Sequence, residues 1–359
     1  HGTNVSGVIA ATGNNGIGVC GVNWKGSIMA LRLSLDLTSI EVAGALDYAA
    51  ANGARVANMS FGGSDFGPEG DPLVNTAIDN AFKKGVLLVA SAGNNDTTEP
   101  LYPAAYYNVM AVSSTNGEDQ KTGHSSFGSW VDIAAPGTDI VTTDLGNGYI
   151  ATAGTSFSGP YVAAVGALVL GYRPQLTNIE VRAVLENTTD PVFYGNVDPN
   201  EGYIGTGRVN AYRALLAADQ RPPLGEIVQP MQQQVFAADG NDIPAVLFVH
   251  GDSYRLDYRG YGHNDWILLS EGTSVTDPNG LVHLLVANPG PGAFELRLSV
   301  TTEGFTHRDR KVFGVELGSN QTSWPKPGGS EDPLTQQEFY LGSPLCLDLD
   351  GDGRNEIVE

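Results

Sequence analysis

Three segments of the chain carry a histidine, an asparagine and a serine in settings that suit acyl transfer. His1 opens His-Gly-Thr, Asn94 ends Ser-Ala-Gly-Asn, and Ser156 lies in Gly-Thr-Ser before a very apolar helical stretch. A serine at a helix N-terminus faces free backbone N–H groups and the positive end of the helix dipole, which stabilise an oxyanion formed beside it. An asparagine amide at the end of a buried strand can donate to the same oxyanion. Taken singly, each segment also fits an ordinary turn or helix cap.

A histidine base has two candidates in this part of the chain. His124 lies in the polar segment 121–126, Lys-Thr-Gly-His-Ser-Ser, which predicts a loop. His1 instead heads a glycine-bearing turn that passes into a helix.

Strands and helices that alternate over residues 1 to about 220 must position these side chains. Capping boxes begin at Thr38 and Thr177, and Asp71-Pro72 pairs an N-cap with a proline at the first helical position. Apolar runs such as Val-Leu-Leu-Val-Ala are typical of parallel strands covered on both faces. The expected fold class is therefore α/β, with a mostly parallel sheet flanked by helices. We predict strands at 28–33, 55–59, 85–90 and 109–112, and helices after Thr38 and Asp71 and over 157–171, 177–186 and 210–218.

Five motifs occur in the order and rough spacing of the subtilisin-like serine peptidases, a family that the chain resembles from residue 1 to about 219. They are His1-Gly-Thr, Asn58-Met-Ser-Phe-Gly-Gly, Ser91-Ala-Gly-Asn, Ala134-Ala-Pro-Gly and Gly154-Thr-Ser-Phe-Ser-Gly-Pro. The resemblance implies a serine endopeptidase that works through an acyl-enzyme. His1 would be the general base, Ser156 the nucleophile and Asn94 the oxyanion donor.

The same resemblance implies a substrate-binding strand and a specificity pocket. Ser60, Phe61 and Gly62 would pair with a polypeptide substrate bound as an extended strand. The opposite wall of the pocket would be formed by Ala92 and Gly93, and Leu101 would lie near its floor. Phe61 and Leu101 also fit ordinary core packing. With a leucine at its floor, the pocket should favour apolar side chains over charged ones.

The chain departs from the family pattern at the orienting carboxylate. In the family an aspartate precedes the histidine, whereas nothing precedes His1, so we expect domain 1–220 to lack its N-terminal part. Asp36 and Asp71 lie in segments that resemble other family regions and are not expected to replace it. Without this carboxylate the 359-residue chain itself should be nearly inert. Asn4 stands where the family usually has a second histidine, which affects fine geometry rather than the mechanism.

Two loops are candidate calcium sites. The loop 13–19 resembles the family's stabilising calcium loop, which implies ligands at Asn15, Ile17 and Val19, although a Gly/Asn-rich turn without an ion also fits. Near the C-terminus, alternating carboxylates could converge on one hard cation. This second pattern fits an EF-hand formally but looks more like the start of an FG-GAP repeat, and a solvated acidic turn is the alternative. Its candidate ligands are Asp348, Asp350, Asp352 and Glu356.

Beyond residue 221 the sequence pattern changes. Short runs with period-two alternation, separated by turn clusters, predict an Ig-like β-sandwich over 225–317. The Pro/Gly-rich segment 318–338 predicts a linker, and 339–359 would begin the FG-GAP-like repeat. Two cysteines, 326 positions apart, exclude a disulfide framework.

Net charge and hydropathy restrict the classes of partner that the chain can bind. The chain has 40 acidic and 19 basic residues, a net charge of −21, which argues against nucleic acid or an anionic membrane as the main partner. The apolar stretch 161–172 is too short to cross a bilayer. We expect a secreted or cell-surface peptidase of unknown oligomeric state. The alternative is a modular surface or adhesion protein whose peptidase-like domain is inactive.

Overall fold

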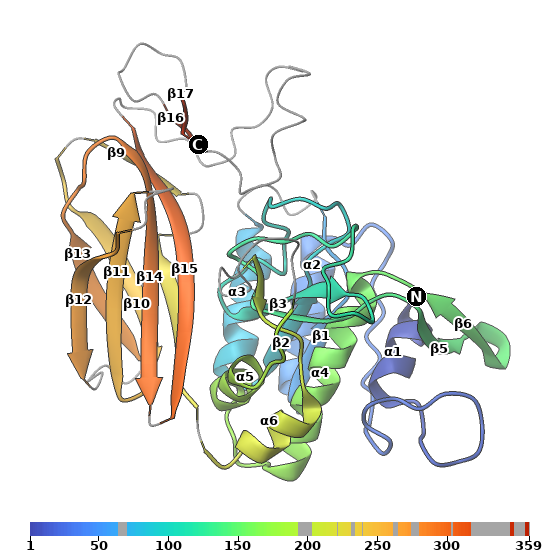
Figure 1. Ribbon diagram of the computed structural model, residues 1–359. Helices are drawn as coiled ribbons and strands as arrows, with labels where there is room; N and C mark the ends of the chain where they lie inside the picture. Colours follow the sequence, from blue (N-terminus) through green and yellow to red (C-terminus); the bar gives the residue numbers. More distant parts are fainter. Residues whose placement is uncertain are drawn as a thin grey trace. The chain divides into compact units, whose positions relative to one another are not determined.

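The chain divides into two units, His1–Arg221 and Pro222–Glu359, and each has its own hydrophobic core. The structure is a computed structural model (Figure 1). It describes residues 1–63, 70–192, 203–220, 222–230, 234–238, 240–260, 265–273, 280–302, 304–316, 345–347 and 356–358.

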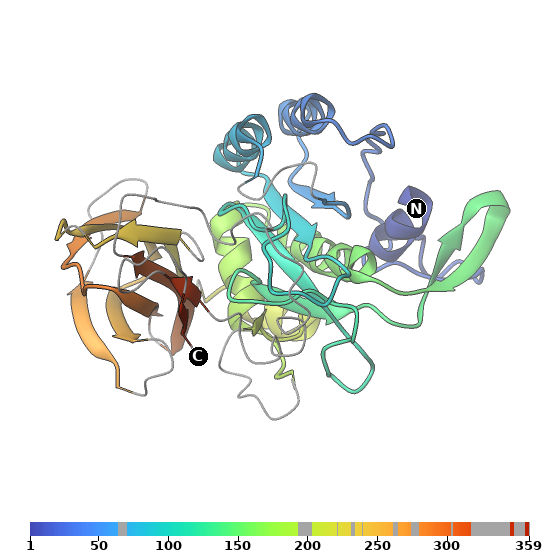
Figure 2. The same cartoon turned by 90° about the horizontal axis from the view of Figure 1, so that it is seen from above.

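A parallel sheet with the strand order β1-β2-β3-β4 forms the centre of the first unit. Every residue of β2 and β3 is buried, because helices cover both faces of the sheet. Figure 2 shows α2 and α3 on one side and α4, α5 and α6 on the other. The expected α/β class is confirmed. The strands are β1 (Val56–Met59), β2 (Leu87–Ser91), β3 (Val109–Thr115) and β4 (Ile133–Pro136), and the helices are α2 (Ser39–Ala51), α3 (Pro72–Lys83), α4 (Thr155–Tyr172), α5 (Asn178–Asn187) and α6 (Ala211–Ala217).

Local capping signals set the helix starts as predicted. Thr38 accepts from the N–H of Glu41 while the Glu41 carboxylate accepts from the N–H of Thr38, and Thr177 and Glu180 form the same reciprocal pair. Asp71 accepts from the N–H groups of Leu73 and Val74 at 2.7 and 3.2 Å. These bonds satisfy N–H groups that have no partner within the helix.

Residues 28–33 form neither a helix nor a strand, so the predicted buried strand is wrong for this structure. Ile28, Met29 and Leu31 are 43, 40 and 39% exposed. A strand exists only where a neighbour accepts and donates its backbone hydrogen bonds. In the described residues β1 lies at the edge of the sheet, and 28–33 pairs with no strand.

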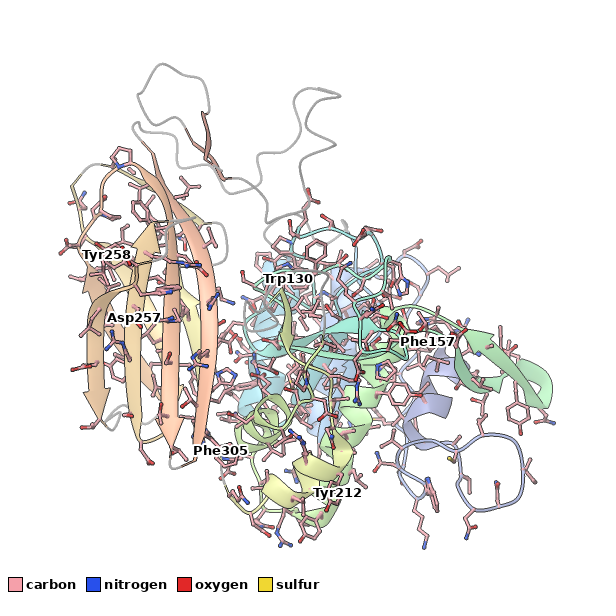
Figure 3. The ribbon with its side chains drawn as sticks, viewed as in Figure 1. Trp130, Phe157, Tyr212, Asp257, Tyr258 and Phe305 are labelled. Carbon is pink, nitrogen blue, oxygen red and sulfur yellow. The ribbon has the colours of Figure 1, made fainter. Side chains whose placement is uncertain are left out.

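A helix and a hairpin complete the described architecture of the first unit around the start of α4. The helix α1 (Gly2–Ala10) packs on α4 and on β5 (Ile140–Asp144), which forms a hairpin with β6 (Gly148–Thr152). Val5, Val8, Ile140 and Phe157 share a small buried cluster. Figure 3 places Phe157 where α4 meets α1. A short strand, β7 (Tyr203–Thr206), contacts β3 and β4.

The second unit contains a three-stranded sheet, β13-β10-β8, and a five-stranded sheet, β12-β11-β14-β15-β9, that share one core. Leu296, Leu298 and Val300 are buried in that core, as their period-two spacing predicts. The Ig-like assignment stays a prediction. The strands are β8 (Leu224–Gln229), β9 (Gln234–Ala237), β10 (Ile243–His250), β11 (Ser253–Gly260), β12 (Ile267–Thr273), β13 (Leu281–Val286), β14 (Gly292–Thr302) and β15 (Phe305–Glu316).

Paired charges cover the outer face of the five-stranded sheet. The side chain of Asp257 on β11, labelled in Figure 3, is fully buried and accepts from Arg255 and Arg297 at 2.8 and 2.9 Å. Burial raises the pKa of the Asp257 carboxyl, but the hydrogen bonds from the two arginines outweigh that effect and hold the pKa below its usual range. The guanidinium groups of Arg297 and Arg259 also lie 4.1 and 4.5 Å from the ring centroid of Trp266. These contacts desolvate the face without leaving a buried charge unpaired.

At the C-terminal end, β16 (Leu345–Leu347) and β17 (Glu356–Val358) pair in antiparallel fashion. The predicted calcium ligands Asp348, Asp350 and Asp352 lie outside the described residues, as does the linker 318–338, and the side chain of Glu356 is not described. In the described part of the chain, no helix combines the length and the apolar character that crossing a bilayer requires.

Replacing Asp71 should separate its capping role from its charge. A hydrogen bond from Ser39, together with the N–H groups of Val74 and Leu73, lowers the pKa of Asp71. We expect Asp71→Ala to lower the free energy of unfolding by about 0.5–2 kcal/mol at neutral pH. Because the pKa is lower in the folded state, the contribution of the charge is present above the ordinary pKa of about 4 and is lost as pH falls through the folded value.

Asp71→Asn is the matched control, since it keeps a capping oxygen without a titrating proton. Denaturant unfolding should be measured from pH 7 to pH 3. At neutral pH the free energy of unfolding should fall less in Asp71→Asn than in Asp71→Ala. As pH falls, the free energy of unfolding of Asp71→Asn should decrease less than that of the parent chain. Equal acid sensitivity in both proteins would contradict the assignment.

Candidate active site

Two neighbouring strand ends and one helix start meet at the same edge of the sheet. Met59, the last residue of β1, lies opposite Ala90 of β2, so the segments that follow these strands leave the sheet side by side. The segment after β1 carries Ser60, and the one after β2 carries Asn94. The N–H of Gly93 donates to Oγ1 of Thr155 at 3.2 Å, which brings the first turn of α4 to this edge.

Asn94 is fixed by the first residue of α4. Its Oδ1 accepts from the backbone N–H of Thr155 at 2.9 Å and from the Thr155 hydroxyl at 3.0 Å. With both acceptor positions of the amide oxygen used, the Nδ2 donor group is directed away from Thr155. The sequence alone predicted a role for Asn94 but missed Thr155, which holds it.

The amide of Asn94 and the backbone of Ser156 flank one small space beside Gly154. A Cβ at Gly154 would lie 3.6 and 3.7 Å from Oδ1 and Nδ2 of Asn94 and 3.8 Å from the backbone nitrogen of Ser156. Gly154 has φ +135°, a conformation that favours glycine, and leaves this space open. Ser156 is the second residue of α4, where backbone N–H groups have no partner within the helix. Two donors thus border a position at which an anionic oxygen could bind.

His1 reaches the same helix end through the packing of α1 on α4. It is the N-cap residue of α1, and its ring centroid lies 5.9 Å from that of Phe157, the residue after Ser156. The structure therefore places His1 near the first turn of α4, which carries Ser156 and contacts Asn94. His124 lies in a turn, as predicted, with Nε2 at 3.2 Å from Thr122 Oγ1. Burial, and then the charge of Lys121, lower the pKa of His124.

A chain of hydrogen bonds joins the predicted substrate segment to the backbone of Ser156. Nδ2 of Asn58 donates to Oγ of Ser60 at 2.8 Å, and that hydroxyl donates to the carbonyl oxygen of Ser156 at 2.7 Å. The end of β1 and the start of α4 are therefore tied to each other. Asn58 and Ser60 occur within one quoted motif, but only the fold reveals their link to Ser156.

Leu101 lies between the two predicted walls of the pocket. A Cβ at Gly62 would come within 3.1 Å of Leu101 Cδ2, and one at Gly93 within 2.7 Å. Ala92, predicted to lie in the opposite wall, is fully buried. Phe61 and Leu101 are both partly buried and also pack against the core beneath α2 and α3.

His1 has no hydrogen bond or ion pair to a carboxylate within the part of the chain that the structure describes. Asp71 caps α3 instead, and Asp36 is exposed in a turn. Asn4 donates to the carbonyl of Thr143 at 2.8 Å and to Oδ1 of Asp144 at 3.0 Å. This amide therefore attaches the first turn of α1 to β5, a role of Asp144 that sequence reasoning missed.

The loop 13–19, predicted to bind calcium through Asn15, Ile17 and Val19, contains a local turn. Oδ1 of Asn15 accepts from the N–H of Ile17 at 3.1 Å in a local turn, and the Ile17 side chain is 68% exposed. Beyond the backbone carbonyls of residues such as Ile17 and Val19, the loop offers amide oxygens but no carboxylate, whereas calcium takes six to eight oxygen ligands. Over the described residues, no three His, Cys, Asp or Glu side chains gather as a metal site.

Comparisons with known proteins agree on the first unit. Thermitase of Thermoactinomyces vulgaris is 40% identical over 218 residues, which cover 60% of this chain and 74% of thermitase. The thermophilic serine proteinase of Bacillus sp. (strain AK1) is 37% identical over 219 residues, 60% of this chain and 52% of that protein. A solved protease of Pseudoalteromonas arctica PAMC 21717 has a TM-score of 0.56 at 29% identity, and the match covers 61% of this chain and 70% of that one. Residues 1–204 match the subtilase family, and the chain belongs to this family.

Proposed function

We propose that this chain carries the catalytic machinery of a serine endopeptidase that cleaves polypeptides through an acyl-enzyme. The observation that carries the proposal is the pair of hydrogen bonds from Thr155 to Asn94, beside Ser156. This arrangement presents an amide donor and a helix-terminal N–H around one space.

The proposed mechanism uses these groups in turn. His1 takes the hydroxyl proton of Ser156 as the Oγ atom attacks the carbonyl carbon of a peptide bond. Nδ2 of Asn94 and the N–H of Ser156 hold the resulting oxyanion. His1 then protonates the leaving amine, and water hydrolyses the ester of Ser156. The oxyanion asparagine was measured in subtilisin itself, where its removal lowers kcat by about 10²–10³-fold.

The proposed substrate is an extended polypeptide. The segment Ser60–Gly62 leaves the end of β1 and is tied to Ser156, so a peptide aligned along it would present its carbonyl beside the nucleophile. Leu101 borders both Gly62 and Gly93, which makes the pocket apolar at its base. An extracellular location, secreted or at the cell surface, completes the proposal, and a solubilising charge of −21 suits it. Calcium binding at 348–359 and at 13–19 stays a prediction.

We further propose that a carboxylate from outside residues 1–359 orients His1. Neither Asp36 nor Asp71 is placed to do so, and His1 lies at the exposed start of α1. The partly exposed apolar segment 28–33 and the sheet edge at β1 are further features that an additional stretch of chain would cover.

The rival proposal is a catalytically inactive surface or adhesion protein in which the β-rich second unit does the work. The lack of a carboxylate bonded to His1 within the described residues favours it. The two proposals differ in whether Ser156 is nucleophilic in the full-length gene product.

Ser156 should react with a fluorophosphonate in the full-length gene product. The expected result is one labelled site at Ser156, because a neighbouring base and an oxyanion site both favour phosphonylation of the hydroxyl. Ser156→Ala should abolish labelling, while Ser27→Ala, at an exposed serine, should leave it unchanged. Mass spectrometry of the labelled peptide checks the site. Absence of label, or equal label in Ser156→Ala, would favour the rival proposal.

The chain 1–359 should be labelled much more slowly than the full-length product. Loss of the triad carboxylate charge in a chymotrypsin-type peptidase lowers kcat by about 10⁴-fold, because the histidine is left in the wrong tautomer, and we expect a loss of that order. Second-order labelling rates of the two proteins, measured under the same conditions, check this expectation. Equal rates would contradict an outside carboxylate.

Leu101→Glu should change substrate preference rather than abolish activity. A carboxylate at the base of the pocket would be desolvated by a large apolar substrate side chain, so kcat/KM for such substrates should fall by about 10–200-fold. For substrates with lysine or arginine at the cleavage position, kcat/KM should fall less or should rise. Leu73→Glu, at a 47% exposed position on α3, is the matched control and should leave kcat/KM for both substrate classes unchanged. A uniform loss across all substrates would contradict the pocket assignment.

A further inference from the structure

The side chain of Lys121 is buried, which is unusual for a lysine. Its side chain is 6% exposed, whereas lysines in proteins almost always keep the ammonium group in water. The ammonium forms a salt bridge with Asp96 and donates to the carbonyl oxygens of Thr122 and Ser125 at 3.1 and 3.0 Å. The ring of Phe127 lies 4.6 Å from Nζ. All three ammonium protons thus have an oxygen acceptor, and an aromatic face adds a cation–π contact.

Oxygens of Asp96, Thr122 and Ser125 surround the Lys121 ammonium, and together they form a cage that favours a positive charge. Thr122 and Ser125 belong to one tight turn, in which the N–H of Ser125 donates to the carbonyl of Thr122 at 3.1 Å. The turn directs two carbonyl oxygens at the same point as the carboxylate of Asp96. Without a positive group between them, these oxygens would be partly desolvated and would repel one another.

The cage joins two loops, one of which carries the amide of the active site. The N–H of Ser126 donates to the carbonyl of Gly93 at 3.0 Å, and the N–H of Asp96 donates to the carbonyl of His124 at 3.1 Å. Asp96 has φ +51°, a left-handed conformation that carries strain in a residue other than glycine. The salt bridge to Lys121 and the bond to His124 hold it there, two positions beyond Asn94.

We propose that the Lys121 ammonium fills a built-in cation site and, through Asp96, helps to position Asn94. Thr155 fixes the amide oxygen of Asn94, and the cage fixes the backbone that follows it. The effect on catalysis rests on the proposed peptidase function, while the cation site itself does not. Lys121 is thus a positioning residue that does not touch the substrate.

Removing the side chain should leave a cavity that a small monovalent cation can enter. In the full-length gene product, Lys121→Ala should lower Tm, and ammonium or potassium chloride should restore part of the loss. Tetramethylammonium chloride at the same ionic strength should not, because the ion is too large and has no N–H donors. Lys121→Met is the matched control: it lowers Tm by removing the charge, but it fills the cavity and should show no selective rescue by ammonium.

Fluorophosphonate labelling of Ser156 gives the second measurement. Misplacement of a catalytic group can cost up to about 10²-fold in rate, so we expect Lys121→Ala to label up to about 10²-fold more slowly and ammonium to restore the rate in parallel with Tm. Asp96→Asn should slow labelling with a smaller effect on Tm, since its carboxylate is 39% exposed. Asp96→Asn therefore tests the positioning role even if Lys121→Ala does not fold.

The outcomes separate the two proposals. If the parent protein does not label, the peptidase function fails, and selective rescue of Tm by ammonium still decides the cation site. If Tm and labelling of Lys121→Ala equal those of the parent, or if ammonium acts no better than tetramethylammonium, the cation site is overturned. Normal labelling by Asp96→Asn would overturn the positioning role.

Discussion

Two hydrogen bonds from Thr155 to one oxygen of Asn94 join the carboxyl end of β2 to the first turn of α4. Further hydrogen bonds attach neighbouring residues to the same turn. Gly93 donates back to the Thr155 hydroxyl, and Ser60, at the end of β1, donates to the carbonyl of Ser156. Both strand ends are therefore attached to the same helical turn. A shift of α4 would move Ser156, Asn94 and Ser60 together, so their relative geometry is a property of the sheet edge.

This close approach explains where the site requires glycine. At Gly93 and Gly62 a Cβ would meet Leu101, and at Gly159 it would come within 3.1 Å of Asn58 Oδ1. Each contact is one that the backbone can make only without a side chain, since the helix start and the strand ends are already held together by hydrogen bonds. The glycines of these motifs therefore let the backbone approach neighbouring residues closely at this edge of the sheet.

How much the sequence can predict depends on how local the cause is. The caps at Thr38, Asp71 and Thr177 were predictable because donor and acceptor lie within three positions, and Asn94 and Ser156 were predictable as members of motifs. The partners that hold them were not, since Thr155 is 61 positions from Asn94 and Lys121 is 25 from Asp96. Residues 28–33 have the apolar pattern of a strand, yet pattern cannot supply the neighbouring strand on which pairing depends.

Asn4 shows how a departure from the family pattern can serve the histidine beside it. Residues 1 and 4 lie three positions apart at the start of α1, so their side chains project from the same side of the helix. A second histidine there would place another titratable imidazole beside that of His1. The amide of Asn4 does not titrate, and it still donates to Thr143 and Asp144. The N–H of Leu145 and then the amide of Asn4 lower the pKa of Asp144, so this attachment is present above the ordinary pKa of a carboxyl and is lost only as pH falls through the lower folded value. Near neutral pH, the contact that anchors α1 to β5 therefore does not depend on a protonation change at Asn4 or Asp144.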